Sequence, residues 1–342
     1  MKKVKGTIIN GISYYPHSNG GGLVAETASV NKSAYIGPNA MVCGNAIVND
    51  AEILGKSLIS DNAKVFGDAK ISDNAVISGN AQVFGDAQVF GDAQVFGDAQ
   101  VFGNAQVSDD VEVLGYTKVY DNAKVVGSAE ILDNARIYGN AKILDGALIC
   151  DSVEVYDNAV VLGNAEISDN ARISKDAKIS DNARISGGSL VTDKALVCAN
   201  SKVYGHAKIH GNAKIHGNAE IYDHAKIFGS TKIYDHAKVV GSAEVSGYAI
   251  ICGITNVLDH AKISGKAKIF GKAKISGETR VSGNAIVYDS AILSDKAIVC
   301  GNAEVSGNAE VSGKTVVYED AEVSGNAEIS GDDLIHGDEI VS

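Results

Sequence analysis

Three histidines are the residues of this sequence whose type and spacing most directly suggest chemistry. His206 and His224 stand at 18-residue spacing, and His260 follows at twice that spacing, so a structure with the same period would place all three along one edge. Imidazole is a common zinc ligand and a general base near neutral pH. Asn is the commonest residue at this position, however, and His tolerates the unusual backbone angles of a corner. We interpret the three as corner residues, with a metal or catalytic role as the alternative.

Aromatic residues also recur at 18-residue spacing and would stack on successive turns as a ladder. The six in the N-terminal half are Phe66, Phe84, Phe102, Tyr120, Tyr138 and Tyr156. A second run holds Tyr234, Cys252, Phe270 and Tyr288. Such ladders stabilise a sheet by cross-strand stacking, and a contiguous apolar stripe can also mark an interface. Both interpretations stay open, and the six-residue run is the predicted binding surface.

Charge is graded along the chain. Lysines occupy most of the outward positions that come directly before the aliphatic in residues 202–280: Lys202, Lys208, Lys214, Lys226, Lys232, Lys238, Lys262, Lys268 and Lys274. Residues 301–342 hold ten acidic residues and one Lys. A solvated surface is the simpler interpretation of both. The alternatives are a head-to-tail contact or a phosphate-bearing ligand for the lysines, and a docking tip for the acidic end.

A six-residue repeat positions all these side chains. From Ile53 to Val341 every sixth residue is Val, Ile or Leu, at 49 consecutive positions. A small residue precedes each aliphatic by two places, and 37 of the 47 from Ala51 to Ala327 are Ala. Alternate strand residues face one side, so both point inward. Gly or Asp followed by Asn, Asp, Ser, His or Lys makes the corner, and three such sides close one 18-residue coil. A period of six fits no α-helix.

The unit V-F-G-D-A-Q resembles the hexapeptide repeat of left-handed β-helix proteins, although its Gly or Asp comes one place later than usual. The N-terminal segment SNGGGLV, which leads into the repeat and is followed by NAMVCGNAIV, is similar to the YdcK-type β-helix proteins, which are often labelled transferases. The fold class expected is therefore all-β, a single-stranded left-handed parallel β-helix of about 17 triangular coils. The left hand is implied by the resemblance alone.

The resemblance also implies an activity. Acyltransferases of this kind use a His as general base and inserted loops that form an acyl-CoA cleft between subunits. Here the register runs from Ile53 to the end without an insertion, and residues 79–107 repeat almost perfectly. We therefore predict a non-enzymatic structural or interaction protein that uses its aromatic and Lys-rich faces. A hexapeptide-type acyltransferase is the alternative, and no cofactor is expected.

The ends depart from the repeat. One residue is missing between Val48 and Ile53, and the small inward residue becomes Asp333 and then Glu339. We expect an N-terminal cap over 1–22, a β-helix over 23–330 and an acidic C-terminal cap over 331–342, because open strand edges must be blocked.

Composition limits the partners and the compartment. The net charge of −12 argues against general affinity for nucleic acid or anionic membranes. No apolar run is long enough for a membrane span, and the dispersed cysteines are expected to be free thiols. We expect a cytoplasmic protein whose partner is another protein or a further copy of itself.

Overall fold

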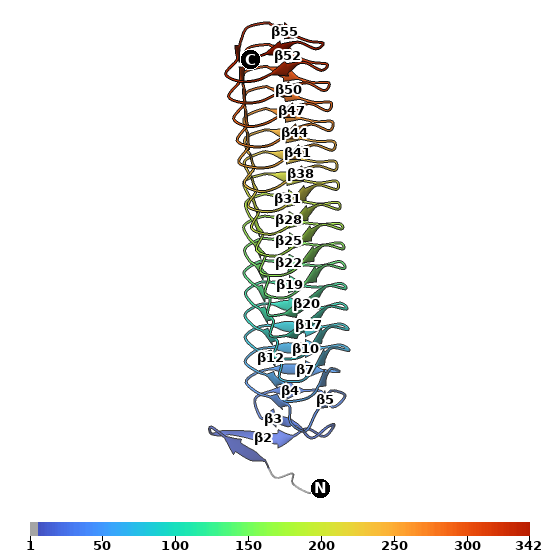
Figure 1. Ribbon diagram of the computed structural model, residues 1–342. Helices are drawn as coiled ribbons and strands as arrows, with labels where there is room; N and C mark the ends of the chain where they lie inside the picture. The colour runs from blue at the N-terminus through green and yellow to red at the C-terminus, as the bar shows by residue number, and fades with distance from the viewer. Residues whose placement is uncertain (1–5) are drawn as a thin grey trace. The chain divides into compact units, whose positions relative to one another are not determined.

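The computed structural model describes residues 6–342, which form two compact units divided between Asp169 and Asn170. We call them unit 1 and unit 2 and describe each by itself. In both, short strands wind into turns of three, and strands of successive turns pair into three parallel sheets (Figure 1). The described residues contain no helix, and so none that could cross a membrane. The predicted parallel β-solenoid is confirmed.

One turn of unit 1 shows how the repeat folds. Strands β10 (Lys64–Phe66), β11 (Lys70–Ile71) and β12 (Val76–Ile77) form its three sides. Strand β13 (Gln82–Phe84) then pairs parallel with β10, so that Val83 lies beside Val65. The remaining strands of the solenoid are mostly two residues long and follow at six-residue intervals. Identical positions are therefore stacked at the strand spacing of about 4.8 Å.

The core consists of the two inward positions of each repeat. Ala63 and Val65, like their counterparts in nearly every later repeat, have no solvent-exposed surface. Each turn is too thin to bury these side chains alone, so the turns above and below supply the rest of the core. Burying an aliphatic side chain of this size contributes about 1.5–3 kcal/mol, repeated at every strand.

The corners of the solenoid need residues with positive φ. From the sequence we expected both residues of each corner pair to adopt it, and the structure limits it to one. Only the first residue of each corner pair has positive φ, as at Asp121 (57°) and Gly139 (69°). The Asn and His residues of the second position do not, which corrects our explanation for His206, His224 and His260. The first-position Asp has a further function: Asp121 Oδ2 accepts a hydrogen bond at 3.1 Å from the backbone N–H of Gly139, one turn later.

Unit 1 begins with an antiparallel extension of one sheet. Strands β1 (Thr7–Ile9) and β2 (Ile12–Pro16) form a hairpin, and β2 pairs with β3 (Leu23–Ala25), the first strand of the solenoid. The missing residue expected after Val48 is present as a shortened turn. Tyr35 pairs with Glu52, which makes this turn one residue shorter than the next, where Glu52 pairs with Lys70.

Unit 2 ends in an exposed turn. The side chains of Asp333 and Glu339 occupy the inward phase but are solvent-exposed, so they avoid the penalty of burying a carboxylate. Strands β55 (Leu334–Ile335) and β56 (Ile340–Val341) still pair with the preceding turn. Strands β3 to β56 make 18 sets of three rather than about 17. The difference arises because β3, β55 and β56 form by backbone pairing without the inward Ala that we had counted.

Candidate interaction surface

One side of unit 1 carries the six predicted aromatic residues, and we call it the stripe face. Its strands are β10, β13, β16 (Gln100–Val101), β19 (Lys118–Val119), β22 (Arg136–Ile137) and β25 (Glu154–Val155). Each is followed or ended by an outward aromatic, because the residue after the buried aliphatic points away from the core. The rings stack with centroids 4.7–5.0 Å apart and planes within 7° of parallel.

Stacking limits what this stripe can bind. The inner rings have both faces covered by their neighbours, so they present edges rather than open faces to solvent, and all six side chains are half-buried. Stacked π-faces leave no room to insert a base or a sugar ring. Desolvation, with Glu154 nearby, raises the pKa of Tyr138 to about 12. Its hydroxyl therefore stays protonated at neutral pH, where it can donate and accept hydrogen bonds.

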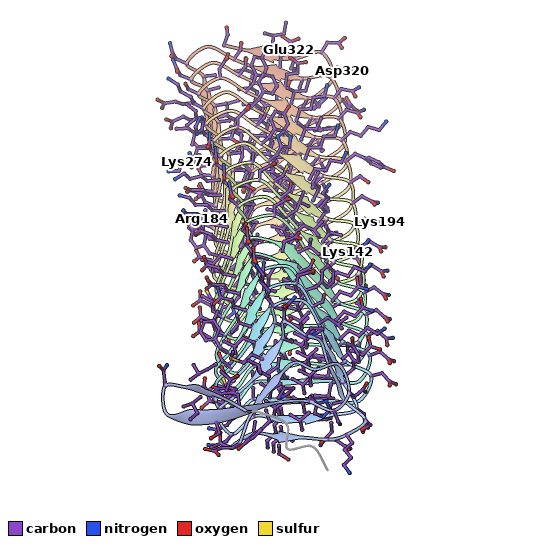
Figure 2. All side chains as sticks on the ribbon, turned by 90° about the horizontal axis from the view of Figure 1, so that it is seen from below. Lys142, Arg184, Lys194, Lys274, Asp320 and Glu322 are labelled. Atoms are coloured by element: carbon purple, nitrogen blue, oxygen red, sulfur yellow. The ribbon has the colours of Figure 1, made fainter. Side chains whose placement is uncertain are left out.

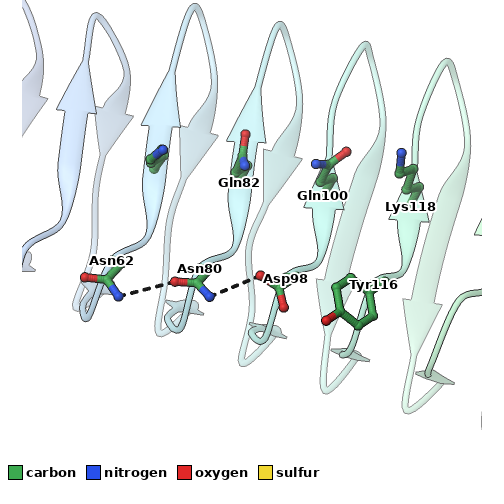
Figure 3. A pocket seen from close by; sticks show the side chains of 8 residues that line it. Asn62, Asn80, Gln82, Asp98, Gln100, Tyr116 and Lys118 are labelled. Atoms are coloured by element: carbon green, nitrogen blue, oxygen red, sulfur yellow. Dashed lines mark hydrogen bonds between the residues drawn. The ribbon is translucent and has the colours of Figure 1, made fainter.

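A polar groove of about 480 Å³ lies on the same face, beside the stripe. A chain of side-chain hydrogen bonds forms one wall: Asn62 donates to Asn80 at 3.3 Å, and Asn80 donates to Asp98 at 3.1 Å. Gln82 and Gln100 form the other (Figure 3). Lys64, Tyr116 and Lys118 complete the lining, and Tyr116 is 65% exposed. The groove offers amide donors and acceptors at regular intervals.

The histidines considered as metal ligands are only partly brought together. His206 and His224 stack with centroids 5.3 Å apart and planes 8° from parallel. The nitrogen lone pairs of imidazole lie in the ring plane, so two parallel rings direct them side by side instead of toward one ion. His260 lies two turns further along that edge of unit 2, and its side chain is exposed. Within residues 6–342, no group of three His, Cys, Asp or Glu side chains is arranged to hold a metal.

Unit 2 contains one cluster that sequence reasoning missed. Asp193 accepts hydrogen bonds from Lys175 Nζ at 2.6 Å and from the Gly211 backbone N–H at 2.9 Å. His210 Nδ1 lies 3.9 Å from Asp193 Oδ2. The hydrogen bond from Lys175 and then that from Gly211 lower the pKa of Asp193. The available signal was Lys175 at a corner position usually held by Gly or Asp, in the same phase of the repeat as Asp193 and one turn before it.

The cysteines are free thiols. All five are half-buried and unpaired with one another, as expected. Burial, assisted by Asp151, raises the pKa of Cys150 to about 11, and burial also raises the pKa values of Cys43, Cys198 and Cys300. A thiol must lose its proton to act as a nucleophile, so these shifts suppress reactivity at neutral pH.

Comparisons with known proteins give one short family match and a solved structure of low similarity. Residues 280–295 match the model of the YdcK beta solenoid repeat, as the sequence resemblance indicated. A solved structure of an Arabidopsis UDP-N-acetylglucosamine acyltransferase is similar at 14% identity and a TM-score of 0.29. The alignment covers 63% of this chain and 71% of that chain. Comparison with curated proteins gives no match.

Proposed function

We propose that this chain is an interaction scaffold whose stripe face binds a protein partner. The observation that carries the proposal is the six-ring stripe and its neighbouring amide groove, which occupy one flat side of consecutive turns. Aromatic residues are enriched at protein interfaces because they bring large contact area at low conformational cost. The Asn and Gln rows supply hydrogen-bonding groups next to that area. An extended partner could contact several equivalent rungs at once.

The resolved pKa shifts support a binding role for this face. The pKa values of Tyr120 and Tyr138 are raised by desolvation, which keeps both hydroxyls neutral. Catalytic acids and bases usually have pKa values moved toward the working pH, whereas these are moved away from it. The groups therefore suit hydrogen bonding within an interface.

The test is a triple substitution in the middle of the stripe, Phe84→Ser with Phe102→Ser and Tyr120→Ser. The matched control replaces the stacked pair Tyr204 and Tyr222 of unit 2, whose centroids are 4.7 Å apart, also by Ser. Both proteins are used as bait for partner capture after circular dichroism has shown that they are folded. We expect the stripe variant to lose the partner that wild type and control retain. Equal capture by all three proteins would refute the proposal.

A hexapeptide-type acyltransferase is the second candidate, favoured by Asp193, which lines a groove of about 300 Å³ with Lys175 and Lys194 and has His210 Nδ1 3.9 Å away. A carboxylate beside an imidazole can orient it as a general base, and the lysines could hold the phosphates of an acyl-CoA. Binding would raise the unfolding temperature with ligand concentration. An unchanged melting curve at millimolar acetyl-CoA would count against this activity; a shift abolished by His210→Ala would support it.

A further inference from the structure

One side of unit 2 has an unusual order of outward side chains, and we call it the lysine face. Its strands are β29 (Lys178–Ile179), β32 (Leu196–Val197), β35 (Lys214–Ile215), β38 (Lys232–Ile233), β41 (Ile250–Ile251), β44 (Lys268–Ile269), β47 (Ile286–Val287), β50 (Glu304–Val305), β53 (Glu322–Val323) and β56. The first residue of each strand points outward and pairs in register with the next turn. The outward column thus has lysines mainly toward its start, isoleucines on either side of Lys268, and two glutamates before a final Ile340.

The lysines of this face lack the ion-pair partners that several lysines on the neighbouring sides of unit 2 have. On one neighbouring side Glu220 lies between Lys202 and Lys238, at 3.5 and 2.9 Å. On the other, Glu244 lies between Lys226 and Lys262. In the described part of the chain, no ion pair involves the four lysines of the column, Lys178, Lys214, Lys232 and Lys268.

These lysines lie close enough to one another to repel. Lys214 and Lys232 are in direct register on adjacent strands, at a spacing of about 4.8 Å. Like charges placed directly opposite each other in a sheet are destabilising. An acidic partner would therefore relieve repulsion as well as add attraction.

Exposed apolar side chains gather around the middle of the same face. Tyr248 and Ile254, at the two corners that flank β41, are 67% and 56% exposed, and Phe270 after β44 is 37% exposed. With the outward Ile250 and Ile286 they form an apolar patch on neighbouring turns. A hydrophobic centre with charged residues further out is the usual anatomy of a protein interface.

We propose that the lysine face binds the lysine face of a second copy of this chain, antiparallel, about a two-fold axis at the turn of Lys268. The axis would run parallel to the strands of the face. The outward column of one copy would then face the same column of the other copy in reverse order. Lys232 then faces Glu304, and Lys214 faces Glu322. Ile250 faces Ile286, and Leu196 faces Ile340 at the outer end. All these pairs occur twice, as an isologous interface requires.

One pair of corner residues at the border of the face is also complementary under this axis, because Lys194 would face Asp338. Figure 2 shows Lys194 and Asp320 projecting along one side of unit 2, whereas Arg184 and Lys274 project along another. Phe270 would meet its own copy at the axis. Three lysines of the axis turn, Lys266, Lys268 and Lys272, would each face their own copy, and their long side chains can bend toward solvent to separate the charges.

Other arrangements satisfy fewer groups. Moving the axis one turn toward the C-terminus places Ile250 opposite Glu322 and Lys232 opposite Ile340. A parallel pairing places the basic turns beside basic turns and the acidic turns beside acidic turns. The face of ten strands measures roughly 45 Å by 15 Å at sheet spacings. That is about 700 Å² per copy, close to the roughly 800 Å² per partner of a standard stable interface.

Reciprocal charge substitution tests the proposal. The first variant combines Lys214→Glu with Lys232→Glu, and the second combines Glu304→Lys with Glu322→Lys. The control combines Lys208→Glu with Lys274→Glu, two exposed lysines on the other sides of unit 2, and changes net charge as much as the first. Mass is measured by sedimentation velocity in a buffer of low ionic strength over a range of concentrations. Circular dichroism checks folding.

Wild type and control are expected to dimerise, and each of the first two variants to weaken the dimer by at least about 100-fold, because like charges would then meet at four places. An equimolar mixture of those two variants should restore a dimer, since every Glu would again face a Lys. A monomeric wild type, a dimer that persists in both variants, or a mixture that fails to associate would each overturn the proposal. The stripe face is in unit 1 and unaltered, so the proposed partner binding is tested separately.

Discussion

Replacing Thr255 by Val should stabilise the protein although it removes a polar group. Thr255 occupies an inward position with no exposed surface, and its hydroxyl has no hydrogen-bond partner in the described structure. A buried hydroxyl that is not hydrogen-bonded loses about 1–3 kcal/mol of desolvation free energy. Val has nearly the same shape, so the substitution opens no cavity. We expect the free energy of unfolding to rise by about 1–2 kcal/mol.

Thr279 provides the matched control, because it occupies the same phase of the repeat in unit 2 and is equally buried. Its hydroxyl donates a hydrogen bond to the Ser276 carbonyl oxygen at 2.5 Å. Thr279→Val removes that bond and should lower the free energy of unfolding by about 1 kcal/mol. The two substitutions are chemically identical, so their opposite signs isolate the hydrogen bond from the change in apolar area.

Urea unfolding followed by far-ultraviolet circular dichroism measures both effects, provided that the slope with urea is unchanged. Hydrogen exchange at the amides of β42 (Asn256–Val257) gives a local check, since long repeat arrays can unfold in parts. If Thr255→Val lowers the midpoint as much as Thr279→Val does, the assignment of Thr255 as an unsatisfied buried hydroxyl is wrong.

Three further predictions concern thiol reactivity, acid stability and a corner. The first uses a protein whose only cysteine is Cys150. At mildly alkaline pH it should react with iodoacetamide about 100-fold more slowly when folded than when unfolded, because a pKa of about 11 leaves far less thiolate than the ordinary value of 9. Equal rates would contradict this. The second concerns Asp193, whose pKa is lowered in the folded protein. Its contribution to stability is therefore present above the ordinary pKa of 3.8 and is lost as the pH falls. Asp193→Asn should flatten the decrease in melting temperature below about pH 4, and an unchanged pH profile would contradict this. The third is that Gly187→Ala should lower the free energy of unfolding by more than about 1–2 kcal/mol. The φ angle of Gly187 is +68°, and the new Cβ would lie 2.4 Å from the Gly205 carbonyl oxygen. Unaltered urea unfolding would contradict this.

The sequence was sufficient for the parts of the fold that depend on strict alternation. Ala63 and Val65 are buried and Phe66 points outward because neighbouring residues of a strand face opposite sides, and the repeat fixes which residue is which. The stacking of Phe66 on Phe84 followed from the length of one turn. The shortened turn after Val48 was also evident, since a deletion shifts the phase of every later residue.

Other features depended on distances that a repeat pattern does not specify. The hydrogen bond of Asp121 to the next turn could not be separated from a simple preference of Asp for corners. The orientation of His206 relative to His224 required ring planes, not only a shared edge. The Lys175–Asp193 contact depends on a side chain reaching across one turn. The final turn was undercounted because backbone pairing continues where the inward Ala pattern has ended.

Cross-linking a captured partner tests the proposed interaction surface most directly. Lys64 and Lys118 line the groove of the stripe face, so an amine-reactive cross-linker should join both to the partner. Mass spectrometry of the complex should show these cross-links, and the Phe84→Ser, Phe102→Ser and Tyr120→Ser variant should not form them. Cross-links confined to lysines of unit 2, or unchanged in the variant, would contradict the proposal that the stripe face is the binding surface.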